Sequence, residues 1–463
     1  MCGIAGILNL NFQPVDFEVL KNMSDAQKHR GPDDQGFVGF SFKKNKISPI
    51  NILNGTTDLK SFHGGIGFNR LSILDLSING HQPMISQNEK VVIAYNGETY
   101  NAFQFKSELK KKGFVFKSRT DTEILLYLYQ QYGIEKMLEL TNGMFAFCIV
   151  DLELQKVFLA CDHAGIKPMY WYKNRNTILF GSEIKSFLSH PEFEGEIDKS
   201  HIDEYLYFKY CAHDRTVFKG VSQMPPGHYL EISTYGERLI KYWEPKLHTY
   251  GSLSKKDALE KLESAIKSSV ISQLISDVKV GCQLSGGIDS SLVTTYARQY
   301  FNAFLDTFSI IFENEKYSEE KYIDQVINNT KTRAHKFDLT PEYFVKNVVS
   351  AAWHMDVPIP IPQAVGIKRL SEGSSEFVTV LLSGEGSDEL MGGYFRFYDL
   401  AYKISKPHLI NFYAKIPIKG KNIYNHFLPK MPAKDYFIKH KAANQYNEYK
   451  YYRPEANFDI NQR

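Results

Sequence analysis

From about Ser254 onward, short apolar runs alternate with amphipathic segments, and this alternation restricts the fold more than any other feature. The apolar runs predict strands, and the segments between them have helical spacing. Strands joined through helices run parallel, so this part of the chain is predicted to form a doubly wound α/β sheet. The predicted strands are 278–284, 305–312, 333–339 and 377–383, and the predicted helices are 254–276, 290–300, 318–329 and 341–354.

The first two hundred residues have a different pattern, with short alternating strands separated by glycine-rich turns. Strands in runs with few helices between them are typical of an α+β layered domain. A chain of 463 residues suits two or three domains, and we place the boundary between Ala212 and Tyr250. The predicted strands are 65–76, 90–95, 144–151 and 156–161, and the predicted helices are 103–112 and 122–132.

The composition is that of a soluble globular protein, with 43% hydrophobic and 23% charged residues and no apolar run long enough for a membrane span. The net charge of +3 is too small to indicate nucleic-acid binding. The residues after Phe395 hold 10 Lys and 3 Arg against 5 acidic residues, a net +8. Solvated helices explain this basic tail better than contact with RNA or anionic lipid, which stays the alternative.

Five cysteines are spread over the sequence without a CxxC pair, which favours neither a disulfide framework nor a zinc site. No signal peptide is visible after Met1, so we expect a cytoplasmic protein. The cysteines are Cys2, Cys148, Cys161, Cys211 and Cys282.

An apolar strand at 278–284 runs directly into Ser285-Gly286-Gly287-Ile288-Asp289-Ser290-Ser291. Small residues at the start of a helix let backbone N–H groups approach a phosphate. The loop lacks the Gly-Lys-Ser/Thr of a Walker A motif, so adenylation with release of pyrophosphate is a better prediction than γ-phosphoryl transfer. Asp289 would then hold Mg²⁺ on the phosphates. The alternative is a plain glycine-rich turn that opens a helix.

A second apolar strand ends in a similar turn, Ser383-Gly384-Glu385-Gly386-Ser387-Asp388-Glu389. In a parallel sheet both turns lie at the carboxyl edge, where ligands bind. The two turns are therefore predicted to hold ATP from two sides, with Asp289 and Asp388 converging on a metal ion.

Cys2 becomes an N-terminal thiol if Met1 is removed. An α-amino group has a pKa near 8 and can accept the thiol proton without a histidine. Considered alone, a cysteine at position 2 is more often incidental.

Six motifs in the first half and two in the second occur in the order found in one enzyme family. Together they resemble the glutaminase and synthetase halves of the glutamine-hydrolysing asparagine synthetases, over about residues 1–400. The motifs are MCGIAG (1–6), HRGPDD (29–34), RLSILD (70–75), GHQPM (80–84), YNGE (95–98), TDTE (120–123), SGGIDSS (285–291) and LLSGEGSDELMGGY (381–394).

For the first half the resemblance implies a layered α/β/β/α fold of the N-terminal-nucleophile type. Cys2 would attack the glutamine side-chain amide, and Asn96 and Gly97 would form the oxyanion hole. Arg70 would bind the α-carboxylate of glutamine, and Glu98 and Asp121 its α-ammonium group. The resemblance also assigns Leu71, Ile73 and Leu74 to glutamine binding. The alternative for Arg70, Glu98 and Asp121 is surface ion pairing.

For the second half the resemblance implies that ATP adenylates a carboxylate, which ammonia then attacks. Glu385 would lie beside the acyl-adenylate and act as a base. Ammonia would need a sheltered apolar passage at the domain interface. The nucleotide contacts implied are Leu284, Ile310, Ser383 and Gly384, with Ser285, Gly286, Gly287 and Ser290 around the pyrophosphate.

The resemblance also suggests the domain limits: a class II glutamine amidotransferase domain at 1–213, a linker and edge segment at 214–250, and an ATP-pyrophosphatase-type domain at 251–463. Family members continue well past this length, and their later arginine-containing motifs are missing, so we expect the second domain to be C-terminally incomplete. Thr99 stands where isoleucine is common, and Cys161 where an arginine is usual.

The expected reaction is glutamine-dependent amidation of aspartate to asparagine, with ATP and Mg²⁺. The expected partners are glutamine, ATP and the carboxylate acceptor, with no nucleic acid and no membrane, and a homodimer is left open. Asp356, in a proline-rich stretch, is either an acceptor contact or a helix-terminal residue. Three alternatives remain: a sugar-nucleotide uronic acid as acceptor, a glutaminase with an impaired synthetase half, and an RNA-binding module.

Overall fold

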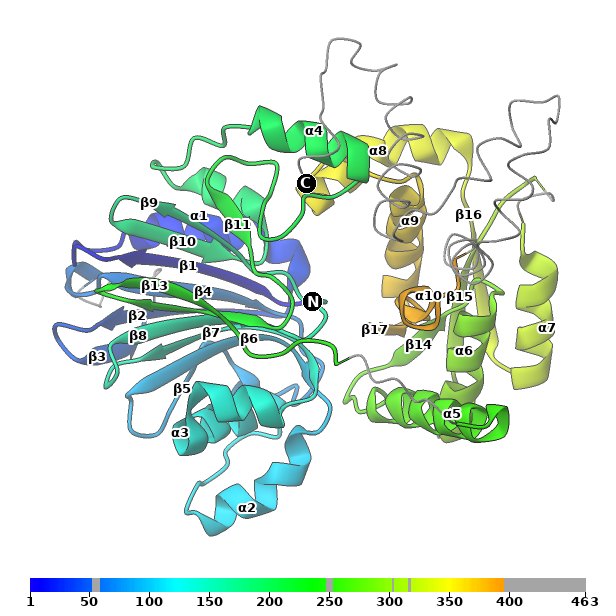
Figure 1. Ribbon diagram of the computed structural model, residues 1–463, viewed down its shortest axis with the longest axis horizontal. Coiled ribbons are helices and arrows are strands. Elements are labelled where there is room, and N and C mark those ends of the chain that lie inside the picture. Colours follow the sequence, from blue (N-terminus) through cyan, green and yellow to red (C-terminus); the bar gives the residue numbers. More distant parts are fainter. Residues whose placement is uncertain (52–58, 247–252, 302–303, 315–317, 395–463) are drawn as a thin grey trace, which may run out of the picture.

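The computed structural model describes two α/β units joined side by side (Figure 1). The described residues are 1–51, 59–246, 253–301, 304–314 and 318–394. The basic tail after Phe395 lies outside them.

The N-terminal unit contains a seven-stranded antiparallel sheet in which β1 occupies the centre between β10 and β4. The central position of β1 buries the start of the chain, since six of its seven residues are fully buried. In spatial order the strands are β11 (Val221–Gln223), β9 (Tyr170–Asn174), β10 (Thr177–Gly181), β1 (Gly3–Asn9), β4 (Gly64–Arg70), β2 (Asp34–Ser41) and β3 (Lys46–Pro49).

A second antiparallel sheet of six strands packs face to face with the first. Phe40, Phe68, Ile178 and Leu159 belong to the core between the two sheets. Burial of apolar side chains on both inner faces fixes which residues of each strand point inward. The strands are, in spatial order, β13 (Gly236–Lys241), β12 (His228–Ser233), β8 (Lys156–Cys161), β7 (Gly143–Asp151), β6 (Val91–Thr99) and β5 (Met84–Ile85).

Helices cover the outer faces of this sandwich, which gives the predicted four-layer α/β/β/α order (Figure 1). The helix α1 (Phe17–Asp25) and the 3₁₀ helix η5 (Ile184–Ser189) pack on the first sheet. The helices α2 (Lys106–Lys111) and α3 (Asp121–Leu140) pack on the second. Thr120 caps α3 by accepting a hydrogen bond from the N–H of Glu123, which places Asp121 in its first turn.

Residues 214–250, predicted as a linker and edge segment, contribute β11 to the first sheet and β12 and β13 to the second. The helix α4 (Lys199–Phe208) precedes them. The described part of the chain then enters the second unit at α5 (Lys255–Ser272).

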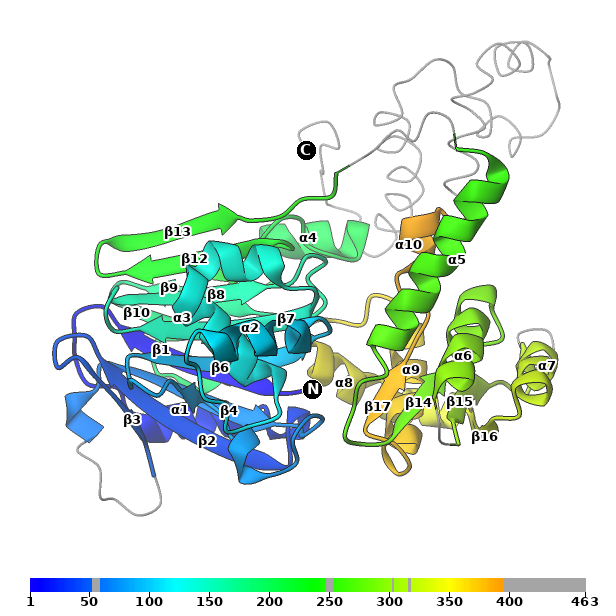
Figure 2. The same cartoon turned by 90° about the horizontal axis from the view of Figure 1, so that it is seen from below.

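The C-terminal unit has a four-stranded sheet whose strand pairs are all parallel, as the alternation of strands and helices predicts. The helices α5 and α6 (Ile288–Tyr300) lie side by side and share a buried cluster with one face of the sheet (Figure 2). Leu370 of α9 (Gln363–Ser375) packs on Phe308 in a separate cluster. The strand order is β16 (Arg333–Asp338), β15 (Asp306–Ile311), β14 (Val280–Gln283) and β17 (Val380–Leu382). The remaining helices are α7 (Glu320–Thr330), α8 (Pro341–Met355) and α10 (Ser387–Met391).

The secondary structure expected from the sequence differs from the structure at two places. The strand predicted at 65–76 ends at Arg70, because the following residues form a loop in which Asp75 has a φ of 53°. The helix α9 was not predicted, since Gly366 and Gly373 weaken its helical pattern.

Candidate active site

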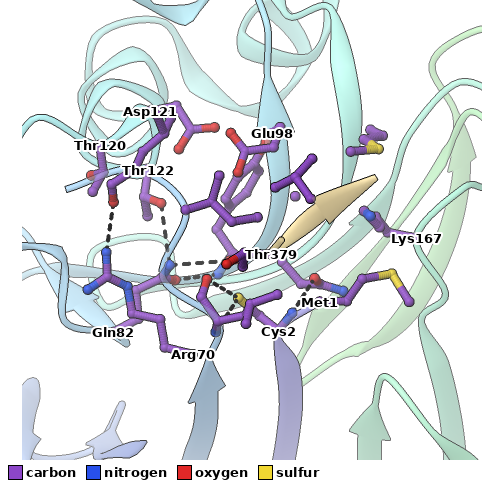
Figure 3. A pocket seen from close by; sticks show the side chains of 18 of the residues that line it. Met1, Cys2, Arg70, Gln82, Glu98, Thr120, Asp121, Thr122, Lys167 and Thr379 are labelled. Carbon is purple, nitrogen blue, oxygen red and sulfur yellow. Dashed lines mark hydrogen bonds between the residues drawn. The ribbon is translucent and has the colours of Figure 1, made fainter. Parts of the chain in front are cut away.

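A cavity of about 180 Å³ lies where the two units meet, at the edge of the sandwich where β1 begins and β6 ends. Most of its lining comes from the N-terminal unit, and Thr379, Val380 and Leu381 line it from the C-terminal unit. Figure 3 shows Cys2, Glu98, Asp121 and Lys167 around the cavity, together with Thr379.

Cys2 directly precedes β1, and hydrogen bonds of its backbone N–H and carbonyl groups fix its position. Its N–H donates to Oδ1 of Asn96 over 3.0 Å, and its carbonyl accepts from Nε of Arg30 over 2.9 Å. The N–H of Leu71 donates to its Sγ over 3.4 Å. Burial raises the pKa of the Cys2 thiol, although the neighbouring amino terminus acts in the opposite direction. A thiol in this state needs a base before it can act as a nucleophile.

Asn96 lies on β6, opposite Ala146 of β7, and Gly97 follows it. Because the N–H of Cys2 can only donate, the Asn96 oxygen must face it, and the amide Nδ2 is left over. This Nδ2 is buried and has no hydrogen-bond partner. Buried donors are rarely left unpaired, so an unpaired donor in a cavity wall indicates a place for an acceptor.

Arg70 is buried at the end of β4, and its guanidinium is held by backbone carbonyl groups. Its Nη2 donates to the carbonyls of Leu74 and Asp75 over 2.9 and 2.7 Å. Gly80 makes this arrangement possible, since a Cβ there would lie 2.0 Å from Arg70 Nη2. No carboxylate pairs with Arg70 among the described residues, so its charge is available to an anion in the cavity.

The loop after Arg70 joins the two units. Leu71, Ile73 and Leu74, which the resemblance assigns to glutamine binding, all line the cavity. The carbonyl of Ile73 accepts from the N–H of Asp277, and the N–H of Asp75 donates to Oδ2 of Asp277 over 2.8 Å. The position of this wall therefore depends on the segment between α5 and β14.

Glu98 and Asp121 place two carboxylates on the same cavity. The N–H of Thr99, the residue that departs from the usual isoleucine, donates to Asp121 Oδ2 over 2.8 Å. Burial raises the pKa of Asp121 to about 6, and it raises that of Glu98 well above its usual value, with the charge of Asp121 adding to the effect. Asp121 is buried and Glu98 is half-buried, and neither forms an ion pair among the described residues, although the charge of Lys167 acts on Glu98. Such a pair of carboxylates suits a ligand with an ammonium group.

The first phosphate-type loop follows β14 and opens α6. Gly286 has a φ of 86°, which favours glycine, and the backbone of the loop is tied by the N–H of Ser285, which donates to Ser290 Oγ over 3.2 Å. Leu284 is buried below the loop, and its carbonyl accepts from Ser309 Oγ over 2.7 Å. Ile310 follows on β15, so the predicted nucleotide contacts from two neighbouring strands lie at one sheet edge.

The second loop follows β17 and lies against the first. A Cβ on Gly384 would come within 2.9 Å of both the Asp289 Cβ and the Ser290 nitrogen. Burial raises the pKa of Asp289, and the negative charge of Asp388 adds to this effect. Glu385 is exposed next to Gly384. Two carboxylates close enough to act on each other fit a Mg²⁺ ion that takes its other ligands from phosphates and water. Among the described residues no cluster of three or more acidic, His or Cys side chains could hold a metal by itself.

One strand connects the two sets of residues. Thr379, Val380 and Leu381 line the cavity beside Cys2, whereas Ser383 and Gly384 follow at the carboxyl end of the same strand. At about 3.3 Å per residue, Leu381 and Glu385 are separated by roughly 13 Å of extended chain at most.

Sequence comparison identifies both halves. The profile described as a glutamine amidotransferase domain matches residues 56–243, and the profile described as asparagine synthase matches residues 261–460. A relative from Methanocaldococcus jannaschii, provisionally named a glutamine-hydrolysing asparagine synthetase, is 34% identical over 412 residues, covering 85% of this chain and 76% of the relative. The chain belongs to the glutamine-hydrolysing asparagine synthetase family.

Two further comparisons give the extent of the match. The glutamine-hydrolysing asparagine synthetase 1 of Bacillus subtilis is 33% identical over 397 residues, which cover 85% of this chain and 59% of that protein. The solved structure of glutamine phosphoribosylpyrophosphate amidotransferase from B. subtilis matches with 18% identity and a TM-score of 0.41, over 68% of this chain and 67% of that one. Family membership makes this chain a relative of glutamine-dependent, ATP-using ligases.

No helix of the described residues has the length and apolar character needed to cross a membrane.

Lys167 is a cavity residue that the sequence analysis did not single out. Burial lowers the pKa of its ammonium group, and Arg30 acts in the same direction. The sequence feature that could have indicated Lys167 is the glycine-containing turn that starts at Asp162. Asp162 accepts hydrogen bonds from the N–H groups of Ala164 and Lys167 and so fixes this turn. Cys161, which departs from the family arginine just before this turn, is 1% exposed in the core between the sheets.

Asp356, expected either at the acceptor or at a helix end, is the C-cap residue of α8. It does not line the cavity around Cys2, and its carboxylate binds Lys185 of the N-terminal unit over 2.9 Å.

Proposed function

We propose that this chain transfers the amide nitrogen of glutamine to an AMP-activated carboxylate, and that the carboxylate is the side chain of aspartate, giving asparagine. The observation that carries this is the unpaired, buried Nδ2 of Asn96 beside Cys2, in a cavity that also presents Arg70, Glu98 and Asp121. The family relationship supports the use of glutamine and ATP.

Glutamine binding follows from the charges of the cavity. Arg70 would hold the α-carboxylate through its charge and a donor of its guanidinium other than Nη2, which already donates to the carbonyls of Leu74 and Asp75. Glu98 and Asp121 would hold the α-ammonium group from the other side. The side-chain amide is then directed toward Cys2.

The chemical step needs Met1 removed, so that the nitrogen of Cys2 becomes an amine. The buried surroundings lower the pKa of the Met1 amine to about 5, and they would keep the amine of Cys2 unprotonated in the same way. This amine takes the thiol proton as sulfur attacks the amide carbon. The oxyanion is stabilised by Asn96 Nδ2 and the N–H of Gly97, the first of which is worth about 3 kcal/mol. The C–N bond then breaks, the proton passes to the leaving nitrogen, and water hydrolyses the thioester to glutamate.

The second site would activate the acceptor. Its carboxylate attacks the α-phosphorus of ATP, and pyrophosphate leaves into the loop formed by Ser285, Gly286, Gly287 and Ser290. Mg²⁺ held by Asp289 and Asp388 would neutralise the phosphate charge when bound. Ammonia attacks the acyl carbon, Glu385 takes a proton from the nitrogen, and AMP leaves.

The apolar side chains of Val380 and Leu381 support a sheltered route for ammonia, because they lie between the two sites on one strand. Exposure to water would convert ammonia into ammonium, which has no lone pair for the attack.

The deciding experiment measures release of glutamate and pyrophosphate with a panel of carboxylates, once with glutamine and once with ammonium salts. We expect pyrophosphate and AMP with aspartate, and loss of only the glutamine-driven rate in Cys2→Ala. Activity with a uronic acid in place of aspartate would change the acceptor. Glutamate release without any pyrophosphate would leave a glutaminase alone, and ADP as the product would contradict the proposal.

A further inference from the structure

Four buried charged side chains connect the C-terminal unit to the backbone of Cys2. Asp356 of α8 binds Nζ of Lys185 over 2.9 Å, and Lys185 binds Oε2 of Glu183 over 2.6 Å. Oε1 of Glu183 accepts from Nη1 of Arg30 over 3.0 Å, and Nε of Arg30 donates to the carbonyl of Cys2 over 2.9 Å. No step of the proposed mechanism uses Asp356, Lys185 or Glu183.

The four charged side chains of this chain of contacts are buried between the two units. The side chains of Arg30, Glu183, Lys185 and Asp356 are 8, 5, 7 and 7% exposed. Trp353 of α8 covers it, with Lys185 Nζ 4.5 Å from its ring centre. Buried charges are tolerated when they are paired. Here Lys185 and Arg30 meet Glu183 and Asp356, and Nε2 of His29 also lies 3.0 Å from Oε1 of Glu183.

Asp356 is fixed in place from both units. It ends α8 with a φ of 57°, and its Oδ2 accepts from the N–H of Ile184 over 2.7 Å. Its carboxylate therefore belongs to the C-terminal unit by sequence and to the η5 turn of the N-terminal unit by hydrogen bonding.

We propose that Asp356 is a positioning residue for the glutaminase nucleophile, which it orients through Lys185, Glu183 and Arg30. This inference rests on the proposed function for its activity readout. While Asp356 shares Lys185 with Oε2 of Glu183, Oε1 of Glu183 binds both Arg30 and Nε2 of His29 over 3.0 Å, and Arg30 fixes the Cys2 carbonyl. Without the Asp356 charge, Lys185 has Glu183 as its one carboxylate partner, and its ammonium draws that carboxylate away from Arg30, which weakens the support of Cys2. Docking of the C-terminal unit thereby sets the geometry of the nucleophile.

The test compares Asp356→Asn, Lys185→Gln and the double variant in the full chain, by glutamate release at varied glutamine concentration. We expect Asp356→Asn to lower kcat about tenfold, with KM changed less than twofold. The double variant removes the competing ammonium and should recover to within about twofold of the unsubstituted protein. A matched control is Glu342→Gln, which neutralises an exposed carboxylate on the same helix and should leave kcat unchanged.

A second readout needs no turnover: the rate at which iodoacetamide alkylates Cys2, followed by peptide mass. Asp356→Asn should change this rate, and the double variant should restore it. If the unsubstituted protein released no glutamate, the proposed function would fail, and the alkylation series would still decide the role of Asp356.

Three results would overturn the inference. Asp356→Asn could keep both the glutamate-release and alkylation rates. The double variant could fail to recover them, which would indicate a general loss of packing. Finally, pyrophosphate release could fall while glutamate release stays intact, which would make Asp356 an acceptor contact.

Discussion

The N–H of Cys2 and the side-chain oxygen of Asn96 form a 3.0 Å hydrogen bond that joins the start of β1 to β6 of the other sheet. This bond fixes which end of the amide faces the cysteine and leaves Nδ2 unpaired. The nucleophile and the donor for its oxyanion are thus oriented by a single contact between the two sheets.

Asn96→Ala should remove this donor. We expect the glutaminase kcat to fall about 100-fold, because one oxyanion-hole donor is typically worth about 3 kcal/mol. KM for glutamine should change little, and an ammonium-driven rate should persist. Asn142→Ala, at an exposed position, is the matched control. A kcat within twofold of the unsubstituted protein would exclude Asn96 from the oxyanion hole.

Gly80→Ala should weaken glutamine binding without touching the ligand itself. Its new Cβ would fall 2.0 Å from Arg70 Nη2, so the guanidinium has to leave its carbonyl partners. We expect KM to rise about tenfold or more, as for Arg70→Lys, since the charge-assisted contact to the α-carboxylate is lost.

Arg238→Lys provides the control for the arginine exchange, because the Arg238 side chain is 70% exposed and pairs with Glu231 on β12, away from the cavity. Steady-state kinetics with glutamine separate the two parameters. An unchanged KM in Gly80→Ala would show that Arg70 does not bind the substrate carboxylate.

Glutamine affinity should depend on pH through Asp121. Its pKa is raised to about 6, first of all by burial, and only the carboxylate form pairs with the ammonium group of glutamine. Below pH 6 this carboxyl is protonated, so binding should weaken as the pH falls, by about tenfold at pH 5 relative to pH 7. Glu98 and Asp121 titrate as a pair, so the curve belongs to both.

Calorimetric titration of a Cys2→Ala variant measures this affinity without turnover. Asp121→Asn should bind weakly at every pH and lose most of the pH dependence. Affinity that stayed constant from pH 5 to pH 7 would contradict the placement of the ammonium group.

Asp289→Asn should separate the two half-reactions. The substitution removes one of two carboxylates proposed for Mg²⁺, so pyrophosphate release should fall about 100-fold, while glutamate release continues. The control is Glu260→Gln, whose exposed partner Lys256 is 3.9 Å away. Equal losses of both products would mean that Asp289 supports the fold rather than the nucleotide.

The C-terminal sheet could be predicted from the sequence because β14 and β17 end in small residues and short apolar runs alternate with helices that, apart from α9, have a regular apolar face. The placement of Cys2, Asn96 and Asp121 on one cavity followed from the family motifs, and no periodicity in the sequence could have indicated it. These residues come from different sheets and a helix start, and only tertiary packing brings them together. Lys167 and the contact between Lys185 and Asp356 were missed for the same reason, since single charged residues look alike whether they are solvated or buried.

Glu183→Gln should change how stability depends on pH. Burial alone would raise the pKa of Glu183, but His29, Lys185 and Arg30 outweigh it and lower the pKa from 4.5 to about 2. A lowered pKa stabilises the folded state above the unfolded value of 4.5, and this contribution disappears as the pH falls from 4.5 toward 2. The shift corresponds to about 3 kcal/mol. Glu183→Gln should therefore lower the free energy of unfolding at pH 7 by at least this order and flatten its decline between pH 5 and pH 2. Urea unfolding at several pH values measures both effects, with the exposed Glu153→Gln as control. A parallel decline in variant and unsubstituted protein would show that Glu183 gains nothing from its three cationic neighbours.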